Sequence, residues 1–433
     1  MSLLFYMWGE QELVLLMIFS CVLNYLIGLW IDHSKFKKLA LTAGIMANLG
    51  ILGYYKYADF FVDSINKILP PTLQSPLLNI ILPIGISFFT FQSISYLVDL
   101  YRNEVQVQKN PFSLALYISL FPQLIAGPIV RYQDIAFDLG HRKHSIELFN
   151  SGIRRFVLGL TKKVLIANVL AQVVDEVFLR NPGELNPYII WFGSLCFGMQ
   201  VYYDFSGYSD MAIGLGRMFG FKFLENFNYP FIAKSIQEFW QRWHISLGSW
   251  FRDYLYIPLG GNKVSTSRNY FNLIAVFFLM GLWHGANYNY IIWALYYGVF
   301  IIIERNWIGG FLHKSKYIGH LYFMFFITSS WVLFKVEDIV VQKDFYWVMF
   351  TGGINADIDY WPNNEQIIVF VLAYFFAFNG YRILQKIELK WLSNSVLVNL
   401  KPTLIDIGLF LAFLACIITL SSNSYNPFIY FRF

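Results

Sequence analysis

Long apolar segments recur along the chain and constrain its fold more than any other feature. A helix that crosses a membrane needs about 20 mostly apolar residues. Segments of this character are Leu13–Ile31, Leu39–Tyr57, Ile80–Tyr101, Phe156–Phe178, Tyr188–Tyr203, Phe271–Trp283, Tyr288–Ile303, Gly319–Val336, Gln366–Tyr381 and Leu404–Leu420. Charged residues make up only 14% of the sequence, against about 25% in soluble domains, so most of the surface must face lipid. We therefore predict an all-α, polytopic membrane protein with a single domain over residues 1–433.

Basic residues set the expected orientation, because cytoplasmic loops carry an excess of lysine and arginine. A lysine-rich loop at residues 35–38 follows the first apolar segment, whereas the residues before that segment include Glu10 and Glu12 and neither lysine nor arginine. The loop before the last segment is also basic, with Arg382, Lys386, Lys390 and Lys401. Both termini are thus predicted outside. The net charge of +5 is explained by topology and indicates no nucleic-acid partner.

The apolar stretch Phe112–Val130 does not fit this pattern of crossings. Basic residues follow it, and it contains Pro122, Gly127 and Pro128. Proline removes a backbone donor and breaks a helix, which is tolerated at membrane depth where protein buries the break. We predict a re-entrant element that returns to the cytoplasmic side; an ordinary kinked crossing helix is the alternative.

Three segments are too polar for helices that face lipid on all sides, namely Gln200–Asp210, Gln237–Asn262 and Met280–Asn289. In the second segment, large apolar side chains recur at helical spacing: Trp240, Trp243, Leu247, Trp250 and Tyr254. This pattern predicts an amphipathic helix at the membrane interface. His244 lies beside the apolar stripe, and Glu238 could pair with Arg242 one turn away.

The third segment contains the most informative residue, His284. The apolar run Phe271–Trp283 before it is too short to cross the hydrocarbon core, so His284 should lie within the membrane. An intramembrane ionisable residue is a functional hypothesis by default, although a buried histidine can also be structural. Histidine can accept a proton from a hydroxyl near neutral pH, and Asn287 and Trp283 are nearby candidate donors for a developing oxyanion. Neither His244 nor His284 has neighbouring residues with metal-ligand spacing, so no metal is predicted.

These residues stand in blocks that resemble the membrane-bound O-acyltransferase (MBOAT) family, in particular its bacterial polysaccharide O-acetylation branch of the AlgI type. The blocks are Leu82–Arg102, Leu120–Tyr132, Val201–Gly216, Asn226–Asn262 and Met280–Gly298. The resemblance runs along nearly the whole chain. It implies a ring of transmembrane helices with re-entrant elements around a thin centre and a tunnel. It also implies that His284, in the WHG motif, is the catalytic base and that His244, in the RWH motif, supports it.

The same resemblance implies the substrates, partners and location. The donor would be cytoplasmic acetyl-CoA, with no bound cofactor, and the acceptor a cell-surface or secreted polysaccharide. A periplasmic or extracellular SGNH-type partner would place the acetyl group on sugar hydroxyls, and the protein would lie in the bacterial cytoplasmic (inner) membrane. We assign Asn287, Trp283, Asp204 and Arg242 as candidate substrate-binding residues.

The C-terminal sequence PFIYFRF (Pro427–Phe433) resembles the aromatic end of the small membrane peptide of D-alanylation operons. That likeness suggests Tyr430 as a transient acyl carrier; an aromatic anchor at the interface is the alternative. Alternative functions are D-alanyl transfer to teichoic acid and peptidoglycan O-acetylation. A glycolipid transporter is a more distant alternative, since transporters also bury broken helices and polar residues, but their paired symmetry is not seen in this sequence.

Overall fold

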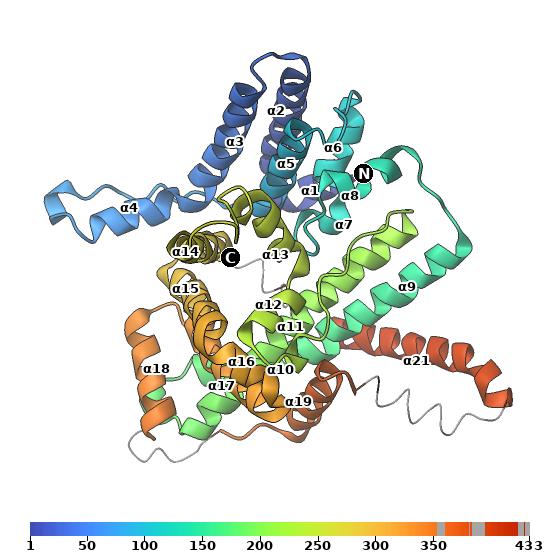
Figure 1. The fold of residues 1–433 in the computed structure, drawn as a ribbon. Coiled ribbons are helices and arrows are strands. Elements are labelled where there is room, and N and C mark those ends of the chain that lie inside the picture. The colour runs from blue at the N-terminus through green and yellow to red at the C-terminus, as the bar shows by residue number, and fades with distance from the viewer. Residues whose placement is uncertain (353–359, 381, 383–394, 423–427, 429–433) are drawn as a thin grey trace.

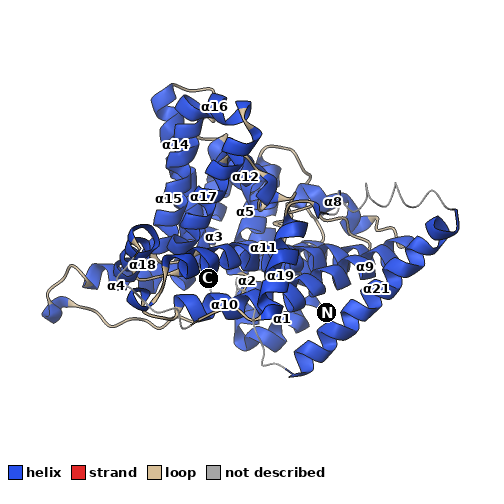
Figure 2. Cartoon of the chain, turned by 90° about the horizontal axis from the view of Figure 1, so that it is seen from below, coloured by secondary structure: helices blue, strands red, loops and turns tan. Residues whose placement is uncertain are grey.

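A computed structural model describes residues 1–352, 360–380, 382, 395–422 and 428. All regular structure in these residues is helical, as Figure 2 shows, which confirms the predicted all-α class. Several helices begin at the side chains that cap helices best. Asn110 precedes Pro111 at the start of α6 (Pro111–Ser119), and its side chain accepts from the Phe112 and Ser113 backbone amides. Asn186 before Pro187 starts α11 (Pro187–Met218) in the same way.

The N-terminal part contains α1 to α8, with a π-helical turn extending α3. Their bounds are α1 (Ser2–Glu10), α2 (Val14–His33), α3 (Lys37–Leu52), η2 (Gly53–Tyr57), α4 (Ala58–Asn66), α5 (Ile86–Tyr101), α6 (Pro111–Ser119), α7 (Phe121–Leu124) and α8 (Tyr132–Gly140). In Figure 1, α2, α3 and α5 lie side by side at one end of the molecule.

The remaining helices form the larger part of the molecule. Their bounds are α9 (Ile146–Thr161), η4 (Lys162–Ala167), α10 (Asn168–Phe178), α11 (Pro187–Met218), α12 (Ile236–Arg242), α13 (Ile245–Phe251), η7 (Arg252–Tyr256), α14 (Thr266–His284), α15 (Tyr288–Ile303), η8 (Glu304–Ile308), α16 (Gly309–Lys314), α17 (Lys316–Lys335), α18 (Ile339–Thr351), α19 (Asn364–Ala377) and α21 (Ser395–Ser422). Helix α11 packs against α9, α10 and α17, and α14 packs against α15. In Figure 1, α12 and α13 lie between the group formed by α2, α3 and α5 and the group formed by α15, α16 and α17.

Two hydrophobic clusters form the interior, and α5 belongs to both. Ile86 and Phe89 pack into the cluster formed with α2, α3, α6 and α8. Phe88 and Phe91, on another face of the same helix, pack into the cluster formed by α10 to α19. The seam between the two parts therefore runs along α5, and the candidate site described below lies on it.

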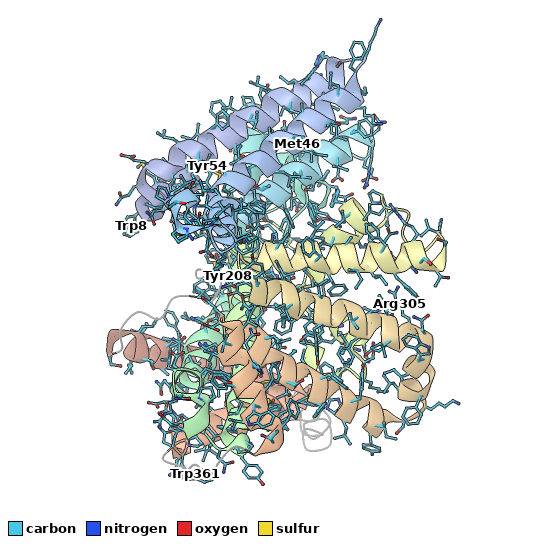
Figure 3. All side chains as sticks on the ribbon, turned by 90° about the vertical axis from the view of Figure 1, so that its left-hand side faces the viewer. Trp8, Met46, Tyr54, Tyr208, Arg305 and Trp361 are labelled. Atoms are coloured by element: carbon cyan, nitrogen blue, oxygen red, sulfur yellow. The ribbon has the colours of Figure 1, made fainter. Side chains whose placement is uncertain are left out.

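The outer surface is suited to lipid. Five helical stretches among the described residues are long and apolar enough to cross a membrane: Ser2–His33, Ile146–Phe178, Tyr288–Leu312, Tyr317–Lys335 and Leu400–Ser422. The second is one continuous helical run of α9, η4 and α10. Exposed aromatic residues such as Trp8, Tyr54 and Trp361 lie on the outside, whereas Tyr208 lies toward the middle in Figure 3. These features agree with a multi-pass membrane protein.

The structure confirms one predicted irregular segment and corrects another. The stretch 112–130 is broken as predicted, because α6 ends at Ser119, α7 ends at Leu124 and Gly127 has φ +100°. Its return to the cytoplasmic side, the tunnel and the single-domain boundary stay predictions. The continuous amphipathic helix predicted after Gln237 is wrong, because His244 adopts φ +45° and divides the segment into α12 and α13. Lys386 and Lys390 of the predicted basic loop lie outside the described residues.

Candidate active site

His284 is the last residue of α14 and only 3% of its surface is exposed. Aromatic rings surround its imidazole, with centroid separations of 5.1 Å to Trp283, 5.1 Å to Trp293 and 5.8 Å to Phe334. Gly285 follows in extended conformation, and a Cβ there would lie 2.3 Å from Cε2 of Tyr290. The glycine after His284 therefore lets α15 begin directly against the end of α14, which fixes the imidazole in a pocket walled by aromatic rings.

His244 occupies the break between α12 and α13, in the left-handed region with φ +45° and ψ +54°. Its Nδ1 lies 3.1 Å from Oδ1 of Asn226. That oxygen also accepts from the Ser246 amide at 3.2 Å and from Ser246 Oγ at 2.9 Å, while the Asn226 amide group donates to Ser209 Oγ. Since Asn226 Oδ1 acts as the acceptor throughout, the network assigns the proton of a neutral His244 to Nδ1. Its Nε2 is then a hydrogen-bond acceptor.

Trp283 lies between the two histidines. Its ring centroid is 5.8 Å from that of His244 and 5.1 Å from that of His284, and Phe88 and Phe91 of α5 pack on its other sides. Within the described part of the chain, neither Trp283 Nε1 nor His244 Nε2 has a hydrogen-bond partner, and both atoms are buried. Leaving a buried polar atom unsatisfied costs about 1–3 kcal/mol. A buried donor and a buried acceptor in one aromatic cluster therefore mark a place where a polar ligand can bind.

A cavity of about 90 Å³ adjoins His284 and Trp283. Its wall also includes Lys56 and the segment Leu82–Phe88. A second cavity of about 240 Å³ adjoins it, since both are lined by Ile84 and Ile125, and extends to α1. The first cavity has room for a group of a few heavy atoms, such as an acetyl group, beside the imidazole.

Lys56 and Tyr57 hold the end of α14 in place. Lys56 Nζ donates to the Trp283 carbonyl oxygen at 2.5 Å, and the Tyr57 hydroxyl donates to the Leu282 carbonyl oxygen at 2.7 Å. The last carbonyls of a helix have no partner within the helix and carry its negative dipole end, so these donors stabilise it. Sequence reasoning missed Lys56, although a lysine inside the apolar segment Leu39–Tyr57 is itself a signal of function.

Two other predicted site residues, Asp204 and Arg242, form ion pairs of their own. Asp204 forms a buried ion pair with Lys163, and the neighbouring Phe205 ring contacts His244 at a centroid distance of 4.6 Å. Arg242 pairs with Glu238 at 2.9 Å, as predicted from their spacing, and also donates to the Asn228 carbonyl oxygen.

Of the two remaining predicted residues, the structure describes only Asn287. Asn287 is half-buried at the N-cap position of α15, three residues beyond His284. Tyr430 lies outside the described residues. Phe428, two residues before it, is described: its ring stands 4.8 Å from that of Tyr208, and Lys163 Nζ lies 4.7 Å from its centre. The side chain of Phe428 thus reaches the buried ion pair on η4 and α11.

This arrangement is chemically suited to proton transfer in a site with little water. His284 can take a proton from a hydroxyl that approaches through the adjoining cavity. His244 Nε2 and Trp283 Nε1 offer one acceptor and one donor beside it, and the aromatic walls keep competing water away.

Comparisons with known proteins identify the family of the chain. The model of the membrane-bound O-acyltransferase family matches residues 36–336, a range that contains both histidines, Trp283 and Lys56. The "Probable alginate O-acetylase AlgI" of Pseudomonas aeruginosa is 38% identical over 497 residues, covering 100% of this chain and 93% of that protein. The "Peptidoglycan O-acetyltransferase" of Helicobacter pylori is 38% identical, covering 78% of this chain and 70% of that protein.

A more distant relative differs in the group it transfers. The "Teichoic acid D-alanyltransferase" of Bacillus subtilis is 32% identical over 53% of this chain and 60% of that protein. The family match and the full-length likeness to an O-acetylase, together with the multi-pass helical fold, lead to one conclusion. The chain belongs to the membrane-bound O-acyltransferase family and is a membrane-embedded O-acyltransferase.

Proposed function

We propose that this O-acyltransferase takes an acetyl group from cytoplasmic acetyl-CoA and delivers it to the outer face of a bacterial cytoplasmic membrane, for O-acetylation of a cell-surface or secreted polysaccharide. The observation that carries the proposal is the cluster in which Trp283 lies between His244 and His284 beside an acetyl-sized cavity. The names of relatives that align over most of the chain support acetyl transfer.

In this proposal His284 is the general base and His244 the supporting histidine. His284 removes the proton of the attacking hydroxyl, which contributes about 10²–10⁴ in rate for a positioned base. Trp283 and Asn287 contribute donors near the acyl group. Because a thioester is already activated, a base and a stabilised oxyanion suffice, and no metal or bound cofactor is invoked.

Tyr430 is the proposed transient acyl carrier. Support comes from Phe428, whose ring packs against Tyr208 and lies over Lys163, next to the helix α11 that also carries Phe205. Phe205 in turn contacts His244. Phe428 is two residues before Tyr430 in the sequence, so its contacts beside α11 support an acyl-carrier role for Tyr430. A secreted SGNH-type partner would then receive the acetyl group from Tyr430 and place it on sugar hydroxyls.

The polymer and the acyl group distinguish this proposal from its alternatives. Peptidoglycan is the alternative acceptor, supported by the Helicobacter pylori relative. D-Alanyl transfer is less favoured, because the relatives named for it align with only 53% and 60% of this chain. A glycolipid transporter has no support from the family match.

The test is acyl transfer by the full chain in proteoliposomes supplied with labelled acetyl-CoA, with and without a candidate SGNH-type partner. We expect label on the wild-type protein and its loss in His284→Ala. In Tyr430→Phe, which keeps the ring and removes the oxygen, labelling should also disappear.

Matched controls make the outcome specific. His33→Ala alters an exposed histidine, and Tyr425→Phe makes the same chemical change five residues before Tyr430; both should label like wild type. Label that persists in Tyr430→Phe would place the carrier elsewhere. Transfer from a D-alanyl thioester but not from acetyl-CoA would replace the proposed donor.

A further inference from the structure

Lys56 is a half-buried lysine on η2 whose side chain reaches the end of α14. Among the described residues, no aspartate or glutamate oxygen lies within 4.0 Å of Lys56 Nζ, whereas other interior lysines pair with acids, for example Lys163 with Asp204. Its Nζ donates hydrogen bonds to the Trp283 carbonyl oxygen at 2.5 Å and to the Ser87 hydroxyl at 3.3 Å. Withdrawing a lysine ammonium group partly from water without a counter-ion costs free energy, so such a residue calls for a functional explanation.

The position of Lys56 supplies that explanation. Its side chain lines the cavity of about 90 Å³ that His284 and Trp283 also line. A lysine ammonium has three N–H donors, and two of them are directed at Trp283 and Ser87. The third is available to a group inside the cavity. We infer that Lys56 is a catalytic residue that binds the developing negative charge on the acyl carbonyl oxygen during transfer.

This inference rests on the proposed function and completes its chemistry. The hydroxyl oxygen of the acceptor attacks the carbonyl carbon of the acyl thioester while His284 takes the hydroxyl proton. The carbonyl π electrons move to oxygen, and the resulting oxyanion is held by Lys56. When the carbonyl reforms, the carbon–sulfur bond breaks and the thiolate leaves with the electron pair. His284 returns the proton to sulfur, so one acyl thioester and one hydroxyl give one ester and one thiol.

The geometry explains why a lysine is used here and why it is held firmly. The Trp283 carbonyl fixes the ammonium one residue from the base, so base and cation are positioned by the same helix end. Gly85, with φ +79°, brings the Ile86–Ser87 wall of the cavity against the Leu124 carbonyl, where a Cβ would lie 2.4 Å away. A positioned cation in a site with little water stabilises an oxyanion more than it would in bulk water.

The test compares Lys56→Met, Lys56→Arg and Tyr57→Phe in the full chain in proteoliposomes, with kcat and KM measured for acyl thioester donors. Loss of one oxyanion donor lowers kcat by about 10²–10³-fold. We expect a fall of that size for Lys56→Met, with little change in KM. Lys56→Arg keeps the positive charge and should recover part of the loss. Lys38→Met, on the exposed start of α3, is the matched control and should behave like wild type.

Tyr57→Phe separates catalysis from helix capping. It removes the hydroxyl bond to the Leu282 carbonyl but leaves the cation in place, so kcat should fall only a few-fold. Equal losses in Tyr57→Phe and Lys56→Met, or wild-type kcat in Lys56→Met, would overturn the role of Lys56 while leaving the proposed function intact. A wild-type protein that is silent with acetyl-CoA but active with propionyl-CoA or a D-alanyl carrier-protein thioester would overturn the proposed donor alone, and the variants would be compared on that donor. Silence with all three donors would overturn both.

Discussion

Basic residues inside the protein are held in two different ways. On α9 and η4, Arg155 and Lys162 contact Asp210 of α11 at 2.8 Å and 2.7 Å, and Lys163 contacts Asp204. At the end of α14, Lys56 instead contacts a backbone carbonyl and a hydroxyl beside a cavity.

The difference separates structural charges from charges available to a reaction. A cation that is neutralised by a carboxylate holds two helices together, and breaking the pair leaves an isolated charge. The electric field of a cation bound only to neutral oxygens is not cancelled by a neighbouring negative charge. Such a cation can therefore act on a group that enters the cavity. Mutations at the α9–α11 interface should therefore lower the stability of the protein, whereas mutations at the end of α14 should lower the rate of acyl transfer.

The largest expected effect is at the α9–α11 interface. Asp204→Ala leaves Lys163 buried without its carboxylate, since the two side chains are 3% and 8% exposed. Breaking a buried pair in this way costs about 3–5 kcal/mol. The thermal unfolding midpoint and the yield of folded protein in detergent should both drop sharply.

A double substitution sharpens this prediction. Lys163→Met with Asp204→Leu replaces the pair by apolar side chains and should recover most of the stability. If Asp204→Ala unfolds like wild type but no longer transfers acyl groups, the charge belongs to the reaction, and Asp204 binds substrate as the sequence predicted.

The second largest effect is expected at the end of α14, where a mutation should lower the reaction rate and leave stability nearly unchanged. In Gly285→Ala the new Cβ would lie 2.3 Å from Cε2 of Tyr290, so the start of α15 and the neighbouring His284 must shift. A misplacement of about 1 Å in a catalytic group can cost about 10²-fold in rate. We expect a fall of that order in kcat with a nearly unchanged unfolding midpoint.

The control for Gly285→Ala is Gly50→Ala in α3, where a Cβ would meet nothing within 4 Å. This variant should keep wild-type activity. A Gly285→Ala protein that is strongly destabilised but fully active per folded molecule would contradict the assignment of this helix end to catalysis.

Features that depend on local sequence could be predicted before the structure was known. The apolar segment Tyr288–Ile303 matches the bounds of α15, because the apolar run and the structure both begin just after Asn287. A helix of this kind is predicted from a continuous apolar run, and such a run can be identified in the sequence alone. The histidine of the WHG motif was found for the same reason, since a short apolar run ends at it.

Long-range partners could not be found in that way. Asn226, which sets the orientation of His244, is 18 residues away in the chain, and the apolar spacing from Trp240 to Tyr254 continues through the break at His244 as if the helix were unbroken. Lys56 is 227 residues from the carbonyl that it contacts. Only the folded chain shows that a lysine in one apolar segment lies at the end of another.

The smallest expected effect concerns an ion pair at the outer edge of α9. Arg154 Nε lies 2.7 Å from Asp406 Oδ1 of α21, and both side chains are 49% exposed. In water such a pair contributes about 0–1 kcal/mol, so Arg154→Ala should barely move the unfolding midpoint in detergent, as should Arg180→Ala in the exposed pair with Glu176.

A larger effect of Arg154→Ala would place this ion pair away from water. The energy of an exposed pair depends on the medium around it, because charges in hydrocarbon cannot rely on water for solvation. If Arg154→Ala and Asp406→Ala each cost several kcal/mol in a bilayer but little in detergent, this part of α9 and α21 lies at hydrocarbon depth. The Arg154–Asp406 pair would then stabilise the fold as the pair of Lys163 and Asp204 does. Ion pairs with a structural role would then extend from the core to the lipid-facing edge of the protein.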